Sequence, residues 1–513
     1  MKRILLIIIT IVFSLTLVGC SNNNTDGDST NKDTLTVGME ADYAPFNWTA
    51  VKQNDFTVPI TGQKNTYADG YDVQMAKLIA EKLNKHLIIR AIEWDGLLPA
   101  LQSREIDVII AGMSPTSERK EQISFSQEYY RSEVVMVVEK NSKYNNATKL
   151  SMWDGAKVVA QRGTLYDDLI PQISNVVHQT PLDTYSALAI SVASGASDAF
   201  IAELPVAQSI VAANKNLKIV NFTAGEGFEI DDDDITVAVG LRKSDVTLLN
   251  EINNALDSIN IQTRNEIMTE AVIRSEAEIP NGFFDLLTKY FVLFAKGTLI
   301  TILLAVVGTA GGFIVSLLLV GLTSFKIDKK RSSIVNKVFK NIAHWFVKIY
   351  VLIFRGTPMI VQAMIFYYGI KYLGDFPFWT PLVASLILVT LNTAAYIAEI
   401  IRGSVNALDK GQGEATKALG MTHTQSLINV IYPQAVRNSL PAIGNEFIVN
   451  LKDTAVLSII GVLDLFNATR QVVGATYNTI QPFIITAVIY LILTSLTSLL
   501  VKHLEKKGGL RNA

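Results

Sequence analysis

Cysteine is nearly absent from this sequence of 513 residues, which contains one cysteine, Cys20, and five histidines. A single cysteine excludes a disulfide within the chain and a metal site built from several thiolates. The acidic run at 231–234 lacks the spaced ligands and turn glycine of a calcium loop, so we expect no bound metal. The chain also lacks the Gly-x-x-x-x-Gly-Lys-Ser/Thr sequence whose backbone amides bind nucleotide phosphates. We therefore expect no cofactor on this chain and no ATP hydrolysis by it.

The chain also has little net charge, but the two signs are unevenly distributed. The net charge is −2, with 21 lysines and arginines against 10 aspartates and glutamates after residue 280, and 24 against 37 before it. This asymmetry indicates an acidic soluble domain on one side of a membrane and basic loops on the other. No basic patch with interleaved aromatic residues is present, so we expect no nucleic-acid partner.

The N-terminus has the pattern of a signal peptide. Lys2 and Arg3 precede an apolar run at 4–18, and Gly19-Cys20 follows. The end of this segment resembles the lipobox of bacterial lipoproteins, which implies cleavage after residue 19 and lipidation of Cys20. The alternative is an uncleaved signal anchor. Residues 20–33, rich in Asn, Ser, Thr and Asp, are expected to form a flexible tether.

Residues 34–275 alternate short β-branched runs with amphipathic helical patterns. A helical face is clear at 71–83, where Val73, Ala76, Ile79 and Leu83 share one side. Such alternation predicts an α/β fold with mostly parallel sheets, in which ligands bind at the carboxyl ends of strands.

Five segments within this region resemble, in the same order, the polar amino-acid solute-binding proteins. They are GMEADYAPF (38–46), ADGYDV (68–73), EWDGLLPAL (93–101), AGMSPTSER (111–119) and FSQEYY (125–130). The resemblance implies a two-lobed fold of the type II periplasmic-binding-protein kind. It implies a first lobe at 34–130 and 226–275 and a second lobe at 131–225. The chain would cross near 129–133 and 222–226, and a last helix from Asp245 would close the first lobe.

A free amino acid presents an α-carboxylate, which a planar bidentate donor such as arginine binds well. Arg119 matches that position of the family, inside a helix that Ser114 and Pro115 are expected to begin. The N-terminus of a helix adds N–H donors and positive potential. The alternative is that Arg119 is one of three solvated charges on that helix.

The remaining candidate residues are assigned by the same resemblance. Glu203 would receive the ammonium, although it could instead cap the helix that Pro205 begins. Tyr43 and Trp94 would sandwich the ligand side chain, although each could serve packing alone. Further expected contacts are Phe46, the Gly112 carbonyl, the Ser114 hydroxyl, and Gln161 and Thr164 before a second helix N-terminus; Arg162 is expected to be weaker or to face solvent.

Substrate identity depends on Glu40, which matches an acidic position that faces the distal group of the ligand. Cationic amino-acid binders of this family have an acid there, and so do glutamine binders. We therefore rank glutamine first and arginine or lysine second. Glutamate or aspartate would place a second carboxylate near Glu40 in a closed cleft, which is costly.

Five apolar segments of spanning length follow, so an all-α transmembrane domain is expected at 276–513. They lie at 294–325, 358–373, 381–401, 440–463 and 482–501. The loop after the first segment and the C-terminal tail are rich in lysine and arginine and are therefore predicted to be cytoplasmic. Five spans with a cytoplasmic C-terminus place residues 34–275 outside the cell membrane.

The polar loop at 405–437 resembles the EAA loop of ABC-importer permeases. Glu414 and Ala415 are followed by Gly420, a turn glycine, and by Pro433, which is expected to stop the second helix; Thr416 replaces the second alanine of the family. In that family the loop is the coupling helix that contacts a separate ATPase. The alternative is an amphipathic connector on the membrane surface.

Two apolar segments, FRGTPMIVQ (354–362) and LNTAAYIAEIIRG (391–403), resemble spans of amino-acid permeases in particular. Asn392 and Glu399 are polar residues within such runs and could line a pathway. For Glu399, the alternative is a pair with Arg402.

The sequence thus predicts a fused substrate-binding and membrane-spanning subunit of an ATP-driven importer of polar amino acids, rather than an enzyme. Expected partners are a free amino acid, a separate ATPase that carries ATP and magnesium, and the membrane. A second copy of the chain is also expected, because five spans are too few for a transport path. The alternatives are an amino-acid-gated channel, a sensor without transport, and an enzyme of the dehydratase kind.

Overall fold

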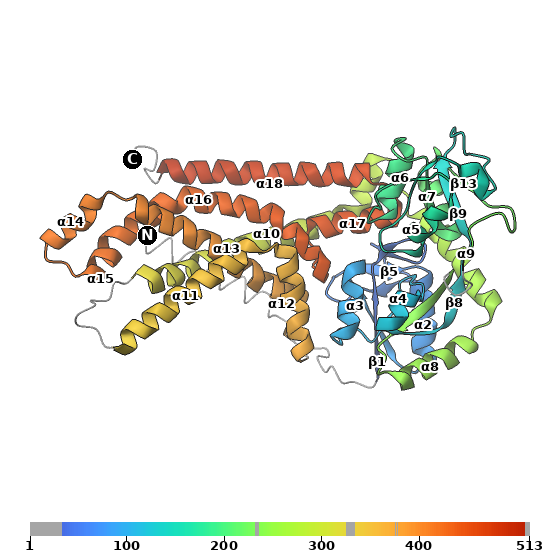
Figure 1. Ribbon diagram of the computed structural model, residues 1–513, viewed down its shortest axis with the longest axis horizontal. Helices are drawn as coiled ribbons and strands as arrows, with labels where there is room; N and C mark the ends of the chain where they lie inside the picture. The colour runs from blue at the N-terminus through green and yellow to red at the C-terminus, as the bar shows by residue number, and fades with distance from the viewer. Residues whose placement is uncertain (1–32, 231–234, 325–333, 375, 377, 508–513) are drawn as a thin grey trace.

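The computed structural model describes residues 33–230, 235–324, 334–374, 376 and 378–507. Cys20, the signal peptide and the tether lie outside these residues. An α/β part with two lobes occupies one end of the molecule, and long helices extend away from it (Figure 1). The fold classes of the two parts, α/β and then all-α, are those the sequence predicts. The expectation of mostly parallel sheets is wrong, because the two five-stranded sheets are mixed and the third sheet is antiparallel.

The first lobe is built on a five-stranded sheet of order β6-β1-β7-β14-β8. β1 is parallel to β6 and β7, whereas β14 is antiparallel to β7 and β8. A smaller antiparallel sheet has the order β2-β3-β5-β4. The strands are β1 (Thr34–Met39), β2 (Asp42–Tyr43), β3 (Asn47–Ala50), β4 (Val58–Pro59), β5 (Tyr67–Asp69), β6 (His86–Ala91), β7 (Val108–Ile109), β8 (Ser124–Arg131) and β14 (Thr236–Leu241).

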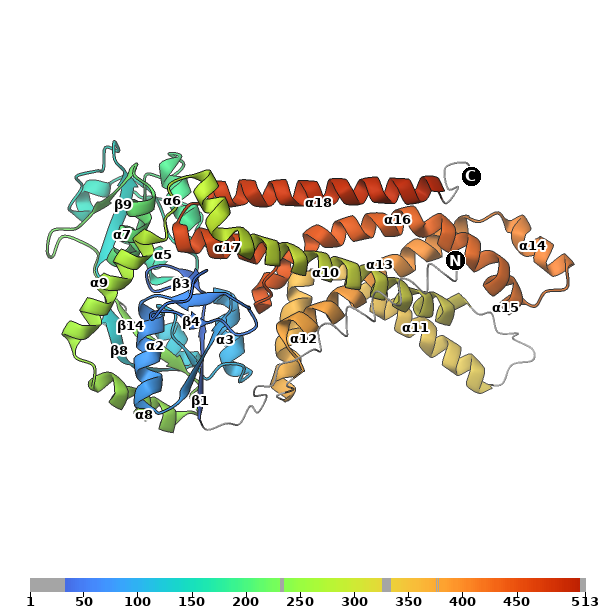
Figure 2. The same ribbon diagram turned by 180° about the vertical axis from the view of Figure 1, so that it is seen from behind.

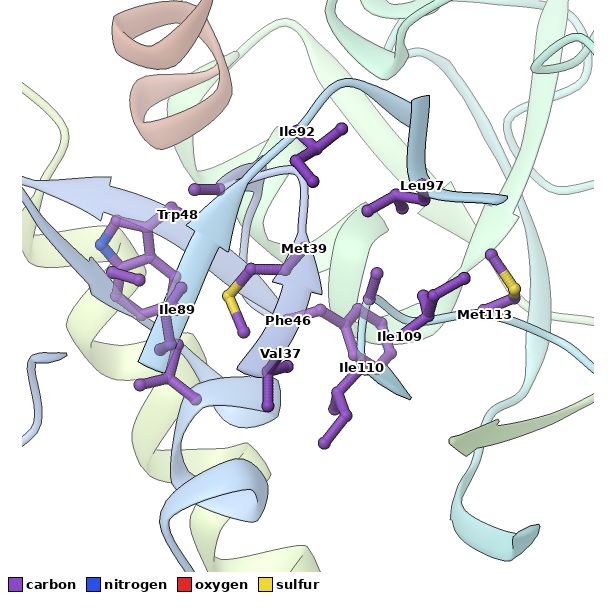
Figure 3. Packing of buried hydrophobic residues seen from close by; sticks show 14 of the residues in the cluster. Val37, Met39, Phe46, Trp48, Ile89, Ile92, Leu97, Ile109, Ile110 and Met113 are labelled. Atoms are coloured by element: carbon purple, nitrogen blue, oxygen red, sulfur yellow. The ribbon is translucent and has the colours of Figure 1, made fainter. Parts of the chain in front are cut away.

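Apolar side chains from both sheets fill the core of this lobe. Met39, Phe46 and Ile109 are fully buried and lie together between the strands (Figure 3). This core holds the strand ends that carry the candidate site. The helices of the lobe are α2 (Tyr71–Lys82), α3 (Trp94–Gln102), α4 (Ser117–Gln122), α8 (Val246–Asp257) and α9 (Ile261–Ala277).

The second lobe has its own sheet, of order β11-β10-β12-β9-β13, and its own core around Trp153. β10 is parallel to β11 and β12, and β9 is antiparallel to β12 and β13. The elements are β9 (Val134–Glu139), η1 (Leu150–Trp153), β10 (Lys157–Val159), α5 (Leu165–Leu169), η2 (Ile170–Gln172), β11 (Val177–His178), α6 (Tyr185–Ala193), β12 (Ala199–Glu203), α7 (Leu204–Ala213) and β13 (Leu217–Val220).

The chain crosses between the lobes at the end of β8 and again before β14. β8 belongs to the first sheet and β9 to the second, which places the first crossing at 132–133. The second crossing lies later than the expected 222–226, because Phe222, Phe228 and Ile230 still pack on the core of the second lobe.

Among the described residues of the second part, three helices are long and apolar enough to cross a membrane, and one bent pair would make a fourth. The pair α11 and α12 is bent by 112°. The helices are α10 (Phe283–Ser324), α11 (Ile334–Gly356), α12 (Met359–Leu373), α13 (Pro381–Ala407), α16 (Tyr432–Asp453) and α18 (Ile480–Lys507). The expected count of five apolar spans is therefore not reproduced among the described residues.

The difference arises mainly at the segment 440–463. Its helix α16 ends at Asp453 and continues as the 3-10 helix η4 (Thr454–Ile460), so no single apolar helix covers the segment. α16 packs against α10, α13 and α18. α16 buries one side against these helices, including Ser439 and Asn450, and polar residues are tolerated on such a side because they do not face lipid.

The basic segment after α10 is also more ordered than the expected loop. Residues 325–333 lie outside the described residues, but 334–356 form the 23-residue helix α11. Several of its large apolar side chains are exposed, including Phe339, Trp345 and Leu352. These side chains alternate with lysines, so the expected loop contains an amphipathic helix, α11.

The polar loop at 405–437 contains α14 (Lys410–Ala418), α15 (His423–Ser426) and the π-helix η3 (Leu427–Ile431). It lies at the end of the helices farthest from the two lobes (Figure 2). Pro433 does not stop the second helix as expected. The π-helix η3 runs directly into α16 with helical dihedrals at Ile431 and Tyr432, so Pro433 lies within a continuous helix, next to the widened π turn that helps to accommodate a proline.

Candidate functional site

A small cavity between the two lobes brings together nine of the ten residues that the sequence analysis assigned to ligand binding. Only Phe46 is outside its lining, because it is fully buried behind Tyr43. The lining consists of Glu40, Tyr43, Trp94, Gly112, Ser114, Arg119, Gln161, Thr164, Leu165, Tyr166, Tyr185 and Glu203. The free volume is about 30 Å³, well below the roughly 150 Å³ that accommodates benzene. An amino acid would therefore require these side chains to move.

Arg119 bridges the two lobes. Its Nη1 donates to the Ser114 carbonyl at 2.9 Å and its Nη2 to the Gly163 carbonyl of the second lobe at 3.1 Å. The guanidinium also lies over the Trp94 ring, 5.1 Å from its centroid. Unlike its neighbours Glu118 and Lys120, which are exposed, Arg119 is partly buried, so it faces the cavity rather than solvent.

The helix that carries Arg119 begins later than the sequence suggests. α4 starts at Ser117, after Thr116 in an extended conformation, rather than at Ser114 and Pro115. Ser114 and Pro115 instead form the approach to the helix. The Ser114 carbonyl thereby accepts from the Arg119 guanidinium and holds its position.

Glu203 lies at the end of β12 with a side chain that is almost fully buried. Its Oε1 accepts a hydrogen bond from the Tyr43 hydroxyl across the lobes at 3.1 Å, and its Oε2 has no hydrogen-bond partner among the described residues. Burial raises the pKa of this carboxyl to about 7. Although Glu203 precedes α7, its side chain makes no capping bond, so it remains available to a cation.

The aromatic residues are arranged differently from the expected pair. Tyr43 stacks between Phe46 and Tyr185, with ring centroids 5.4 Å and 5.5 Å away. Both faces of Tyr43 are thus covered, which leaves its hydroxyl and edge toward the cavity. Trp94 alone presents a face, and Arg119 lies over it.

Three lining residues were missed by the sequence analysis: Leu165, Tyr166 and Tyr185. The first two directly follow Thr164, so the expected helix N-terminus already marked their position. Tyr185 follows Thr184, whose hydroxyl accepts from the Ala187 amide as a helix cap. The sequence indicates this helix cap, but it does not indicate that Tyr185 lies beside the cavity.

The second lobe contributes polar groups from the turn after β10. The Gln161 side chain donates to the Asp183 carbonyl at 3.1 Å, and the Thr164 hydroxyl donates to the Gln161 carbonyl at 2.7 Å. Arg162 is exposed and pairs with the Asp183 carboxylate at 2.8 Å. Arg162 therefore faces solvent, which is one of the two arrangements expected for it.

Glu40 lies at the acidic end of the cavity. Burial and the nearby carboxylates of Asp42 and Glu93 raise its pKa, whereas the Arg470 guanidinium opposes this rise. Burial also raises the pKa of Asp42 to about 6. This end of the cavity favours a positively charged or hydrogen-bond-donating group and disfavours an anion.

The polar loop at the far end of the helices presents Glu414 and Ala415 to solvent, whereas Thr416 is buried. The Thr416 hydroxyl bonds with that of Ser426 at 2.6 Å and so joins α14 to α15. Gly420 has φ of +74°, a left-handed conformation that favours glycine. The loop is thus a pair of short packed helices that exposes Glu414 between two exposed lysines, Lys410 and Lys417.

The two polar residues within the apolar runs have partners in the chain. Asn392 is buried and donates to Gln362 Oε1 at 2.9 Å. Glu399 accepts from Arg402 Nε at 2.9 Å and lies 3.6 Å from Arg355. The arrangement of Glu399 therefore agrees with the ion-pair alternative.

Two protein families match separate parts of the chain. Residues 35–270 match the bacterial extracellular solute-binding proteins, family 3, and residues 332–508 match the binding-protein-dependent transport system inner membrane component. The first match covers both lobes, and the second covers the helices from the basic segment onward.

Several transport proteins are similar to the second part of the chain. The arginine transport system permease protein of Bacillus subtilis (strain 168) is 40% identical over 166 residues, which are 32% of this chain and 74% of that protein. The putative glutamine transport system permease protein of Rickettsia bellii is 35% identical over 227 residues, 44% of this chain and 98% of that protein. The glutamine transport system permease protein of Escherichia coli (strain K12) is 31% identical over 215 residues, 42% of this chain and 92% of that protein.

The first part is similar to solved solute-binding structures. An amino acid ABC transporter substrate-binding protein of Streptococcus pneumoniae bound to L-arginine is 25% identical, with a TM-score of 0.39, covering 47% of this chain and 96% of that one. An ancestral arginine-binding protein bound to glutamine is 31% identical, with a TM-score of 0.38, covering 46% of this chain and 97% of that one.

Proposed function

We propose that this chain captures glutamine outside the cell and conducts it across the membrane. The chain belongs to the amino-acid permeases of binding-protein-dependent transport systems, and it carries a family 3 solute-binding domain on the same polypeptide. The observation that carries this proposal is the convergence of Arg119 and Glu203, one from each lobe, on one cavity. An arginine and a buried carboxylate suit the carboxylate and ammonium of a free amino acid.

The substrate is proposed from the chemistry of the acidic end. Glu40 would accept a hydrogen bond from the distal amide of glutamine or pair with the distal cation of arginine or lysine. Permease relatives named for glutamine and for arginine transport are compatible with both. Glutamine is placed first, and the basic amino acids are the second candidate.

The assembly is proposed as two copies of the chain with two separate ATPase subunits that bind ATP and magnesium. The lobes would lie outside the cell membrane, whereas the loop around Glu414 would lie in the cytoplasm, where it would contact the ATPase. We include α16 as a fifth crossing helix, because the helices packed against it would shield polar groups such as Ser439 and Asn450 from lipid.

Binding and coupling can be separated with two variants of the full chain in lipid nanodiscs. Arg119→Ala should weaken glutamine binding by at least about 100-fold, because a partly buried charged hydrogen-bond partner is removed. Glu414→Lys should leave glutamine affinity unchanged, since Glu414 is remote from the cavity. It should, however, abolish ATP-dependent uptake when the ATPase is supplied.

The measurements are isothermal titration calorimetry with glutamine, arginine and lysine, and radiolabelled uptake into proteoliposomes. Arg162→Ala is the control for Arg119, because that side chain faces solvent in the same cleft region. Normal glutamine binding by Arg119→Ala would refute the assignment of the site, and normal uptake by Glu414→Lys would refute the coupling role.

A further inference from the structure

An arginine from the membrane part of the chain closes the acidic end of the ligand cavity. Arg470 lies in α17 (Leu465–Thr476), and its guanidinium contacts Asp42 at 3.3 Å and Glu93 at 2.7 Å in the first lobe. Its side chain is 22% exposed, and those of Asp42 and Glu93 are 15% and 16% exposed. Partial desolvation strengthens these contacts beyond those of an ordinary surface ion pair.

Glu40 connects this ion-pair cluster to the ligand cavity. It lines the ligand cavity with Arg119 and Glu203, and it also lines an adjoining cavity of about 450 Å³ that Arg470 borders. The Arg470 charge lowers the pKa of Glu40 against the effect of burial. The carboxylate that would face the distal group of a ligand is therefore already influenced by a cation of the permease.

The adjoining cavity extends between the lobes and the permease helices. Its lining includes Tyr185 of the second lobe, Phe466 of α17, Tyr477 directly after α17, and Phe483 of α18. The acidic end of the ligand cleft thus opens toward the membrane part of the chain rather than toward bulk solvent alone.

α17 is held against the first lobe with little freedom. The Tyr477 hydroxyl donates to the Ala44 carbonyl, and the Gly474 backbone lies so close to Asp42 that a Cβ there would be 2.1 Å from the Asp42 carbonyl oxygen. Arg470 is consequently fixed beside the acidic cluster when the lobes lie on α17.

We propose that Arg470 is a tethered competitor for the acidic end of the cleft, which expels a cationic ligand side chain when the binding lobes dock on α17. This inference rests on the proposed function and deepens it. In the docked arrangement Arg470 pairs with Asp42 and Glu93 and so lowers the negative potential that the guanidinium of arginine or the ammonium of lysine would use. A neutral amide experiences no such repulsion, so docking favours glutamine over the basic amino acids.

The test compares binding of arginine and glutamine to the full chain in nanodiscs, with Arg470→Gln and Arg470→Lys as variants. Arg470→Gln should tighten arginine binding by about tenfold or more, because like charges that face the same cavity end repel appreciably at an effective dielectric of about 20. Glutamine affinity should change by less than about threefold, within the effect of a neutral contact. Arg470→Lys retains the charge and should resemble the unmodified chain.

The control is Arg355→Gln, since Arg355 pairs with Glu399 elsewhere in the permease helices. It should move neither affinity. Equal changes for arginine and glutamine in Arg470→Gln, or no tightening of arginine, would overturn the proposal. Such a result would leave the proposed function intact as long as Arg119→Ala still abolishes glutamine binding.

A second variant keeps the proposal testable if Arg470→Gln does not fold. Glu93→Gln removes one of the carboxylates that hold the excess negative charge, so arginine binding should weaken relative to glutamine. An unchanged ratio of the two affinities in this variant would contradict the competition just as directly.

Discussion

At the scale of single residues, the site depends on charged groups that the fold removes from water. Burial raises the pKa of Glu203 to about 7, and the hydroxyls of Tyr166 and Tyr43 only partly offset the cost of its lost hydration. Such a carboxylate gains more from an incoming ammonium than an exposed one would, because the ligand supplies the missing partner.

This environment predicts a pH dependence of binding. The ammonium pairs with the deprotonated form of Glu203, so affinity should fall by about tenfold per pH unit below about 7, until the pKa of the ligand-bound state is reached. Calorimetry at pH 6 in buffers of different ionisation enthalpy should detect release of about one proton per ligand.

The same raised pKa has the opposite effect on folding. The folded state holds the proton of Glu203 more tightly than the unfolded state does. The contribution of Glu203 to the free energy of unfolding therefore falls as pH rises from about 4.5 through 7. The Glu203→Gln variant should bind glutamine weakly at all pH values, and neither its affinity nor its free energy of unfolding should show the pH dependence that Glu203 causes. A wild-type affinity that is constant from pH 5 to pH 8 would contradict the role of Glu203.

At the scale of elements, α17 is the joint between the two parts of the chain. It packs against β2 and β3, which carry Tyr43 and the edge of the cavity. η4 and α12 add contacts to α3, and the Tyr367 hydroxyl donates to Glu105 of the first lobe. Any movement of the first lobe should therefore displace α17, η4 and α12 first.

Gly474→Ala should loosen this joint. Its Cβ would meet the Asp42 backbone at 2.1 Å, so α17 must shift, and overpacking of this kind costs roughly 1–3 kcal/mol. We expect glutamine affinity to stay within about threefold while uptake falls by about tenfold or more.

Calorimetry and proteoliposome uptake measure these two effects separately. The matched control is Gly369→Ala in α12, where an added Cβ meets open space. Uptake by Gly474→Ala equal to that of Gly369→Ala would show that close docking on α17 is dispensable.

At the scale of the whole molecule, the two lobes and the polar loop lie at opposite ends of the long helices (Figure 1). α10 alone has 42 residues, which at about 1.5 Å per residue exceeds the roughly 30 Å of a hydrocarbon core. Its first turns pack with α17 through Leu286 and Tyr290, so it links the membrane helices to the docking region.

The proposed topology predicts a labelling pattern. Met152→Cys in the second lobe should react with a membrane-impermeant maleimide in intact cells, whereas Leu419→Cys should react only after permeabilisation. Both side chains are exposed, at 50% and 78%, and labelling of the unmodified chain, with Cys20 alone, provides the baseline. Labelling of Leu419→Cys in intact cells would reverse the orientation.

The sequence by itself determined the two fold classes, the order of the domains and most of the site lining. Short motifs sufficed because each strand end in an α/β lobe carries its own side chain into the cleft, as Arg119 and Glu203 do. It could not place Tyr185 or the start of α4, since these depend on how the lobes close and how a short helix is capped.

Only the tertiary structure decided which side chains from distant parts of the chain meet. Arg470 and Asp42 are 428 residues apart, and no local pattern of charge or hydropathy encodes that contact. The packing of α16 against α10, α13 and α18 likewise depends on neighbours in space, because a helix side shielded by others tolerates polar residues that a hydropathy pattern counts against it.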